Sequence, residues 1–287
     1  MLSNDKGLSS ATSLEYRVRM APLLAVVIIA AAVCLFCWIT SLITHEHSWV
    51  DRLWSIVPVV YVWVFVAFSE RMDARLLIMA VLVTLWGARL TFNFARKGGY
   101  SGTEDYRWAI LRGRMKRWQF ELFNLFFIVL WQNTILVLIA LPAYTAYQNP
   151  APLGPLDLLV AALFLALLSG ETVADQQQWN FHRAKAAGTA EGRFLSTGLW
   201  RYSRHPNFFF EQAQWWTLFL FGAIAAGSLL QWTVAGPVLL TLLFVGSTIF
   251  TESITRSRYP EYAEYQAVTS PIIPWIPRAA GTARALA

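Results

Sequence analysis

Long apolar runs recur along this chain, and they restrict its possible folds more than any other feature. A helix needs about 20 apolar residues to cross the hydrocarbon core of a bilayer. Only 14% of the residues are charged, whereas a soluble globular domain carries about 25%. The sequence therefore predicts an all-α, polytopic membrane bundle of about seven transmembrane helices, at residues 21–44, 53–70, 74–95, 119–141, 156–178, 207–229 and 232–252.

Basic residues are unevenly distributed between the two sides of the predicted spans. Most of the Lys and Arg residues fall in the loops after the first, third and fifth spans and in the tail after the last. Cytoplasmic loops carry such an excess, so we expect the N-terminus outside and the C-terminus in the cytoplasm, within the bacterial inner membrane. The predicted domains are a polar tail (1–20), one integral membrane domain (21–275) and a C-terminal tail (276–287).

The fifth predicted span ends in polar residues, "SGETVADQQQWNFHR". Glu171 and Asp175 are four residues apart and share a helix face, which Gln178 and His182 continue. Ionisable groups within a span are costly and usually functional. We interpret this face as the lining of a wet cavity or of the bundle interior. Polar residues emerging at the membrane interface are the alternative, which would explain His182 more easily than Glu171.

A cluster of cations precedes the sixth span in the stretch "RYSRHPN". Arg201, Arg204 and His205 come just before a predicted helix start, where unpaired N–H groups and the helix dipole attract anions. Asn207 and Glu211 lie one turn apart just beyond. We interpret the cluster as a site for a phosphate-bearing ligand. Basic side chains that reach toward lipid headgroups are the alternative.

Two further stretches carry polar residues whose pattern fits more than one role. Glu252 and Arg256, four residues apart at the end of the last span, are spaced to pair on a helix, and Tyr262 follows them. They fit a structural salt bridge with an interfacial aromatic belt as well as a ligand contact. The loop "GGYSGTEDYRW" (98–108) mixes aromatic and charged residues, so we expect it to fold back onto the core or a cofactor.

Four motifs in order along the chain resemble the DUF1295 branch of the steroid 5α-reductase-like membrane enzymes. They are "DRLWSIVP", "LWGARLTFNFARKGGYSGTEDYRW", "ETVADQQ" and "LWRYSRHPNFFFE". The resemblance covers about residues 48–275. It implies a seven-helix membrane oxidoreductase that holds NADPH between its last helices. The hydride would pass to a conjugated C=C bond of a lipid or steroid-like substrate that enters from the bilayer, and we expect a monomer that binds no nucleic acid and no metal.

The resemblance and the residue chemistry lead to one predicted cofactor site. The pyrophosphate and 2′-phosphate of NADPH require cations and N–H groups, and its ribose and nicotinamide groups suit carboxylates and amides. No GxGxxG motif follows a strand, so we predict no Rossmann domain. The predicted cofactor-binding residues are Asp175, His182, Arg183, Arg193, Arg201, Tyr202, Arg204, His205, Asn207, Glu211, Arg256 and Tyr262.

The resemblance also implies an acid that hydrogen-bonds the substrate carbonyl oxygen and so assists hydride transfer. The steroid reductases use a Glu seven residues before a Pro, and Asp51 takes that place before Pro58. Their partner Tyr falls here on Trp86, which is no acid, and this departure weakens the case for a steroid substrate. The predicted catalytic residues are Asp51 and Tyr106, with Tyr61 and Tyr100 as alternatives to Tyr106.

Two rival functions are open. Isoprenylcysteine-type methyltransferases carry a similar RHPxYxG stretch and bind S-adenosylmethionine, but they usually show an EExxL pair after the last span. The corresponding segment here is "TESIT", and Phe210 replaces the glycine. A transporter or lipid-binding protein would need polar groups through the whole membrane depth, and here they gather toward the cytoplasmic half of the last three spans. The reductase is the preferred interpretation.

Overall fold

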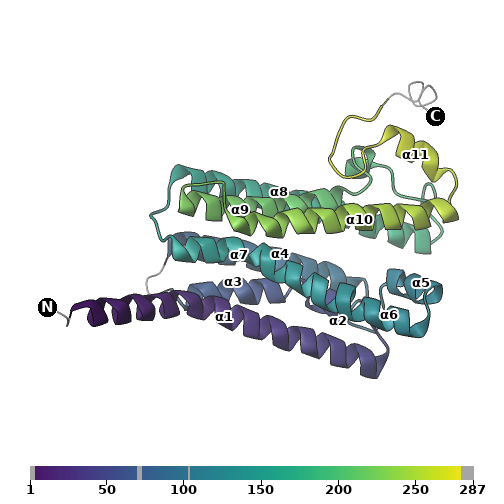
Figure 1. Cartoon of the computed structure of the whole chain (residues 1–287). Helices are drawn as coiled ribbons and strands as arrows, with labels where there is room; N and C mark the ends of the chain where they lie inside the picture. The colour runs from purple at the N-terminus through teal and green to yellow at the C-terminus, as the bar shows by residue number, and fades with distance from the viewer. Residues whose placement is uncertain (1–3, 70–72, 103, 279–287) are drawn as a thin grey trace. The chain divides into compact units, whose positions relative to one another are not determined.

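The computed structural model describes residues 4–69, 73–102 and 104–278, with side chains from Met20 onward within these ranges (Figure 1). Within this part of the chain every regular element is a helix, and one isolated bridge joins Ser203 and Ser270. The predicted all-α class is confirmed. The chain divides into two compact units, which are described separately below. Unit 1 extends to Val160 and includes Leu218–Gly236, and unit 2 comprises Ala161–Thr217 and the described residues from Pro237 onward.

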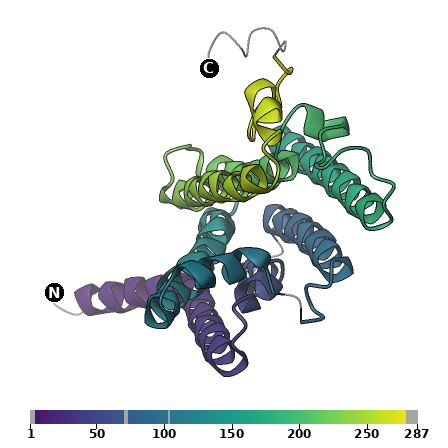
Figure 2. The same cartoon turned by 90° about the vertical axis from the view of Figure 1, so that its right-hand side faces the viewer.

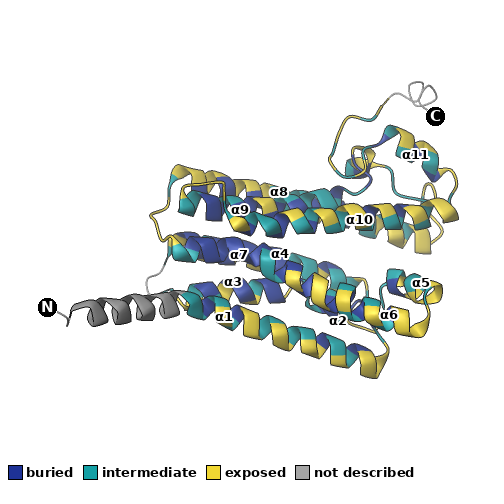
Figure 3. Cartoon of the chain, in the orientation of Figure 1, coloured by how far each residue is buried: buried dark blue, intermediate teal, exposed yellow. Residues whose placement is uncertain are grey.

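Unit 1 is a helical bundle with its core around α3 and α7. Its elements are α1 (Asn4–Thr44), α2 (Trp49–Leu53), α3 (Val57–Ala67), α4 (Ala74–Arg96), α5 (Tyr106–Arg114), α6 (Arg117–Phe123), the π-helix η1 (Asn124–Trp131), α7 (Gln132–Gln148) and η3 (Trp232–Val234). Helix α3 packs against α4 and α7, and α1 packs against α7. Most of α7 is buried (Figure 3), because its apolar faces meet neighbours on several sides.

Unit 2 contains the C-terminal helices, drawn in green to yellow in Figures 1 and 2. Its elements are most of α8 (Pro155–Ala186), η2 (Gly198–Arg201), the first half of α9 (Pro206–Ala226), most of α10 (Ala235–Arg258) and α11 (Tyr262–Val268). A Cβ added at Gly170 on α8 would lie 2.5 Å from the Phe210 ring on α9. Phe208 on α9 contacts Phe244 on α10, with ring centroids 4.6 Å apart.

Five helices are long and apolar enough to cross a membrane: Met20–Thr44, Ala74–Arg96, Arg117–Gln148, Pro155–Ala186 and Trp232–Arg258. The predicted span at 53–70 forms only the 11-residue α3, flanked by turns. Helix α9 has 21 residues but carries Glu211, Gln212 and Gln214 in its first half, which lowers its mean hydropathy. The membrane-type bundle is confirmed, whereas the number seven and the orientation stay predictions.

The predicted tail and domain boundaries can be compared with these elements. The backbone of residues 4–20 is helical and continuous with the rest of α1, so the part of the predicted tail that the structure describes belongs to a helix. The predicted single domain, 21–275, falls across both compact units. The polar composition of residues 1–20 marked them as a tail, but it did not predict that the described part of this tail is helical.

A buried ion pair joins the beginnings of α4 and α8 within unit 1. The Arg75 guanidinium donates to both carboxylate oxygens of Asp157, at 2.6 and 2.9 Å. The two side chains are 3% and 0% exposed. The guanidinium also donates to the Pro152 carbonyl at 3.2 Å, and Asp157 accepts from the Gly154 N–H at 2.8 Å. The pair therefore fixes the connection between α7 and α8 against the start of α4.

Candidate functional site

The polar face of α8 meets polar side chains of α9 inside unit 2. Glu171, Asp175 and Glu211 are each buried, at 3–4% exposure, and for Glu171 and Asp175 the sequence predicted this. The Gln214 amide nitrogen donates to Glu171 at 2.6 Å. Three carboxyl groups therefore lie in the interior of unit 2. A buried carboxylate is costly unless hydrogen bonds or an opposite charge stabilise it.

An unpaired acceptor lies at the start of α9. The Asn207 side-chain oxygen is buried, and no hydrogen-bond partner for it lies among the residues that the structure describes. The Thr248 hydroxyl on α10 is likewise buried without a hydrogen-bond partner among the described residues. Buried polar atoms are almost always paired, so an exception needs an explanation such as a bound group.

Arg204 is the centre of a buried network rather than a free cation. Its Nε and Nη2 atoms donate to the two Glu252 oxygens at 2.6 and 3.0 Å. Its Nη1 atom donates to the carbonyls of Gln266 and Thr269. Glu252 also accepts from the Gln266 amide at 2.7 Å and lies 3.1 Å from His205 Nε2. Glu252 therefore neutralises Arg204, and the predicted Arg204 contact with a phosphate stays a prediction.

The exposed Arg256 contrasts with this arrangement. The sequence spacing favoured Arg256 as the helical partner of Glu252, but Arg256 lies on the exposed face of α10. Glu252 instead reaches the chain segment before α9. Tyr262 is buried beside this carboxylate, its hydroxyl 3.5 Å from Glu252. Burial, followed by the negative charge of Glu252, raises the pKa of Tyr262.

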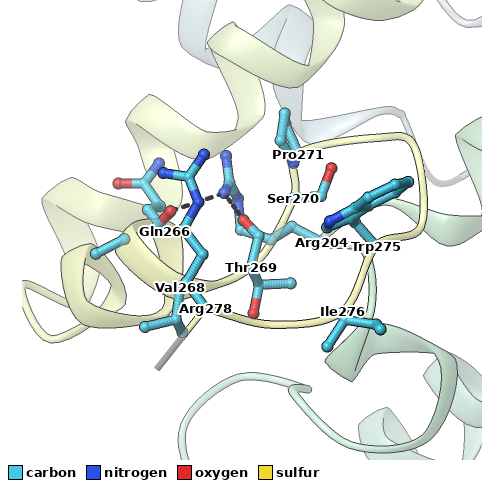
Figure 4. Close-up of a pocket in the computed structure, with 10 residues that line it drawn as sticks. Arg204, Gln266, Val268, Thr269, Ser270, Pro271, Trp275, Ile276 and Arg278 are labelled. Atoms are coloured by element: carbon cyan, nitrogen blue, oxygen red, sulfur yellow. Dashed lines mark hydrogen bonds between the residues drawn. The ribbon is translucent and has the colours of Figure 1, made fainter. Parts of the chain in front are cut away.

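The segment after α11 folds over the "RYSRHPN" stretch. The Arg204 N–H donates to the Ser270 carbonyl at 2.8 Å, the Ser203 hydroxyl to the Ile272 carbonyl at 2.6 Å, and the Trp275 N–H to the Tyr202 carbonyl at 2.9 Å. A partly open cavity of about 350 Å³ lies beside these contacts. Figure 4 shows its lining, which includes Arg204, Gln266, Thr269, Ser270, Trp275 and Arg278.

The other predicted cofactor residues lie at the surface of unit 2. His182, Arg183, Arg193, Arg201 and Tyr202 are exposed. Arg193 lies 3.4 Å from Glu261, and both side chains are largely solvent-accessible. The exposed Arg183 and Arg201 side chains can be reached by an anion from solvent. The structure places them in the same unit as the buried carboxylates without showing a ligand contact.

Two positioning residues, Gln177 and Trp200, were given no role in the sequence analysis. Gln177 on α8 accepts from the Leu199 N–H at 3.0 Å, and it lies against Gly198, whose φ of +63° favours glycine. The Trp200 indole donates to the Ala174 carbonyl at 3.2 Å, and Tyr265 donates to the Trp200 carbonyl. The run of three glutamines, "QQQ", was the available signal, but spacing alone did not show which glutamine faces the loop.

Asp51 in unit 1 accepts a hydrogen bond from a residue of α5. The Trp108 indole donates to Asp51 at 2.9 Å, and the Ser48 hydroxyl accepts from the Asp105 N–H at 2.9 Å. Burial, followed by the negative charge of Asp105, raises the pKa of Asp51. A carboxyl group with a raised pKa suits a proton donor. Trp108 is itself buried, so the prediction that residues 98–108 fold back onto the core is confirmed.

The candidate tyrosines differ sharply in environment. Tyr106 begins α5 and is 54% exposed, whereas the Tyr100 hydroxyl donates to the Arg52 carbonyl at 3.0 Å. Tyr61 is fully buried, and its hydroxyl has no partner among the described residues. Trp86 is fully buried as well. Of the three tyrosines, Tyr61 alone combines burial with an unused hydroxyl.

Comparisons with known proteins place these features in context. A model of the family DUF1295, described as a protein of unknown function, matches residues 37–269. An uncharacterized protein of the fission yeast Schizosaccharomyces pombe is 41% identical over 250 residues, which cover 80% of this chain and 73% of that protein. No solved structure matches.

Proposed function

Because the chain belongs to the DUF1295 family, we propose that it is a membrane-embedded reductase that uses NADPH to reduce a conjugated C=C bond of a lipid-like substrate. The observation that carries the proposal is the unpaired Asn207 oxygen, buried in the same unit as Asp175 and Glu211. An amide oxygen accepts hydrogen bonds, and the nicotinamide carboxamide and ribose hydroxyls donate them. The motif resemblance supplies the identity of the cofactor.

The remaining groups of unit 2 fit the charges of a dinucleotide. Arg183, Arg193 and Arg201 are exposed cations and would hold the phosphate groups by charge-assisted hydrogen bonds. Asp175 and Glu211 would accept from hydroxyl groups. Arg204 would act as a positioning residue, because it fixes the loop before α9 through Glu252. When bound, NADPH supplies the hydride, and the chain supplies binding, orientation and the proton.

The same proposal includes a topology. Helices α3 and α9 would complete seven spans, with the N-terminus outside and the C-terminus in the cytoplasm, as the basic loops favour. A multi-pass membrane location agrees with the five long apolar helices. The bacterial inner membrane stays a prediction, since the relative described above comes from a yeast. A monomer with a lipid-like substrate is part of the same proposal.

The first test measures cofactor binding. Purified protein in detergent is titrated with NADPH by calorimetry, and we expect the Asn207→Ala variant to bind about 1 kcal/mol more weakly, the typical contribution of one hydrogen bond. Asn180→Ala is the matched control, because Asn180 is an exposed asparagine of α8 in the same unit. Absence of NADPH binding together with tight S-adenosylmethionine binding would favour the methyltransferase.

The second test concerns proton donation by Asp51. We expect Asp51→Asn to keep NADPH affinity and to lower turnover of a conjugated enone at least about a hundredfold, the lower end of general acid catalysis. Oxidation of NADPH, followed by its absorbance, measures the rate. Asp73→Asn is the control, because Asp73 caps α4 and asparagine caps a helix equally well. Undiminished turnover in Asp51→Asn would remove Asp51 from the chemistry.

A further inference from the structure

The cavity beside the segment after α11 has no ligand in the proposed function. We call it the C-terminal cavity, because most of its lining lies between Gln266 and Arg278. It is partly open, and its volume of about 350 Å³ is at the lower end of the range for small-molecule pockets. The cavity therefore suits one small charged group with part of an apolar chain, rather than a whole dinucleotide.

Two arginines line the C-terminal cavity, and one of them lacks a partner charge (Figure 4). The Arg204 guanidinium is paired with Glu252, at 2.6 and 3.0 Å. Arg278 is exposed and forms no ion pair with any residue that the structure describes. The chain has no Asp or Glu after Glu264, so the tail beyond Arg278 adds no acidic side chain. The cavity therefore carries one uncompensated positive charge.

The polar groups around the C-terminal cavity suit an anion. None of the residues that line it is acidic, and they include Ser270 next to Arg204 and Arg278. A serine hydroxyl and a guanidinium both donate hydrogen bonds, and phosphate oxygens accept them. The Gln266 amide already donates to Glu252. Ser270 and Arg278 are therefore the groups that can contact an anion in this cavity.

Backbone hydrogen bonds hold the walls of the C-terminal cavity. The Trp275 N–H donates to the Tyr202 carbonyl at 2.9 Å, and the Arg278 N–H donates to the Val268 carbonyl at 2.9 Å. Three prolines between Ser270 and Arg278 restrict the backbone further. A preformed wall loses little conformational freedom when a ligand binds. The position of Arg278 beside the cavity is therefore set before any anion arrives.

Large apolar side chains project from the same segment. Ile273, Trp275 and Ile276 are 65%, 72% and 77% exposed, and the last two also line the cavity. Contact of such side chains with water is unfavourable compared with burial in an apolar environment. Tryptophan is enriched where a membrane meets water, because its ring is apolar and its N–H is polar. The segment therefore fits the boundary between lipid headgroups and acyl chains.

The C-terminal cavity also lies near the end of a candidate membrane span. The apolar helix Trp232–Arg258 ends with Arg256 and Arg258 in its last turn, and its Glu252 binds Arg204 at the cavity wall. Basic pockets near the ends of membrane helices bind anionic lipid headgroups. The cavity is therefore placed at the depth where phospholipid headgroups occur.

We propose that the C-terminal cavity binds the phosphate of an anionic phospholipid. Arg278 and Ser270 donate to the phosphate oxygens, and Trp275 and Ile276 contact the first part of the acyl chains. A phospholipid is the occupant, because a free phosphate would leave the apolar side chains in water. The bound lipid holds the segment after α11 at the membrane surface. This site lies outside the proposed NADPH site, and its argument does not depend on the reductase.

The test uses three soluble probes on the full-length protein in dodecyl maltoside, freed of native lipid. Dioctanoyl phosphatidylglycerol has the charge and the chains, dioctanoyl phosphatidylcholine has the chains without the net charge, and glycerol 3-phosphate has the charge without the chains. Native mass spectrometry counts the bound molecules and gives each dissociation constant. We expect phosphatidylglycerol to bind at least about tenfold more tightly than either of the others, a difference of about 1.4 kcal/mol.

Two variants locate this binding at the C-terminal cavity. Arg278→Gln should weaken phosphatidylglycerol binding at least about tenfold, the scale of one charged hydrogen bond. Trp275→Ser should weaken it at least about fivefold, because the apolar contact is lost. Arg258→Gln is the matched control, because Arg258 is an exposed arginine of the same unit that does not line the cavity. Thermal unfolding verifies that each variant is folded.

The outcomes distinguish the lipid site from its rivals and from the proposed function. Unchanged phosphatidylglycerol affinity in Arg278→Gln overturns the site, since the lipid would then bind elsewhere. Glycerol 3-phosphate that binds as tightly as phosphatidylglycerol overturns the lipid and indicates a soluble phosphate ligand. Equal binding of the two lipids overturns the role of charge. Selective loss in Arg278→Gln and Trp275→Ser supports the lipid site even where calorimetry finds no NADPH binding, a result that would remove the reductase alone.

Discussion

Replacing Glu252 with alanine is expected to destabilise unit 2 by about 3–5 kcal/mol, because the Arg204 guanidinium would stay buried without its partner charge. Both side chains of this pair are 9% exposed, and the shortest contact between them is 2.6 Å. The loss should also free the segment after α11, since Arg204 donates to the Gln266 and Thr269 carbonyls. Denaturant unfolding in detergent gives the free energy, and hydrogen exchange of residues 262–278 reports the segment.

Glu261→Ala is the matched control for this prediction. Glu261 also pairs with an arginine of unit 2, but its partner Arg193 is 68% exposed and Glu261 is 41% exposed. Solvent screens such a pair, and its loss typically costs less than about 1 kcal/mol. Equal effects of the two substitutions would show that the Arg204–Glu252 pair is no more important to folding than a surface contact.

Replacing Asp157 with alanine is expected to cost unit 1 about 3–5 kcal/mol by the same mechanism. Arg75 would lose both of its hydrogen bonds to the carboxylate, and the Gly154 N–H would lose its acceptor. The effect should be visible as a lower unfolding temperature. Increased proteolysis of the connection between α7 and α8 should accompany it.

Asp73→Ala tests whether this second effect is specific to the buried pair. Asp73 caps α4 by accepting from the Arg75 and Leu76 N–H groups. Loss of such a cap typically costs about 1 kcal/mol. A cost for Asp157→Ala that does not exceed this value would contradict the idea that the ion pair fixes the start of α8.

The sequence predicted the elements of the fold better than the contacts between them. The apolar runs located every long helix, since length and hydropathy alone determine a candidate span. The run at 53–70 was too long, because Ser55 and Ile56 lie in a turn before α3. Because the flanking turns contain apolar residues as well, composition alone does not show that the helix within the run is short.

The site was predicted only in part, because a sequence shows which residues share a helix face but not which distant residues meet. Periodicity placed Glu171 and Asp175 on one interior face, and both are buried, as is Glu211. The true partner of Glu252 is Arg204, 48 residues earlier, and helical spacing can suggest only neighbours one turn away. The π-helix was not predicted either, because "NLFFIVLW" has no feature that separates it from an ordinary apolar helix.

The crossing of the last segment over the "RYSRHPN" stretch has a consequence for biosynthesis. The Arg204 guanidinium donates to the Thr269 carbonyl, which lies 65 residues later in the chain. When Arg204 has just been added to the growing chain, Glu252 and Thr269 have not yet been synthesised. The Arg204 guanidinium therefore lacks both of these acceptors at that stage. Unit 2 therefore completes its interior only after Glu252 and Thr269 have been synthesised.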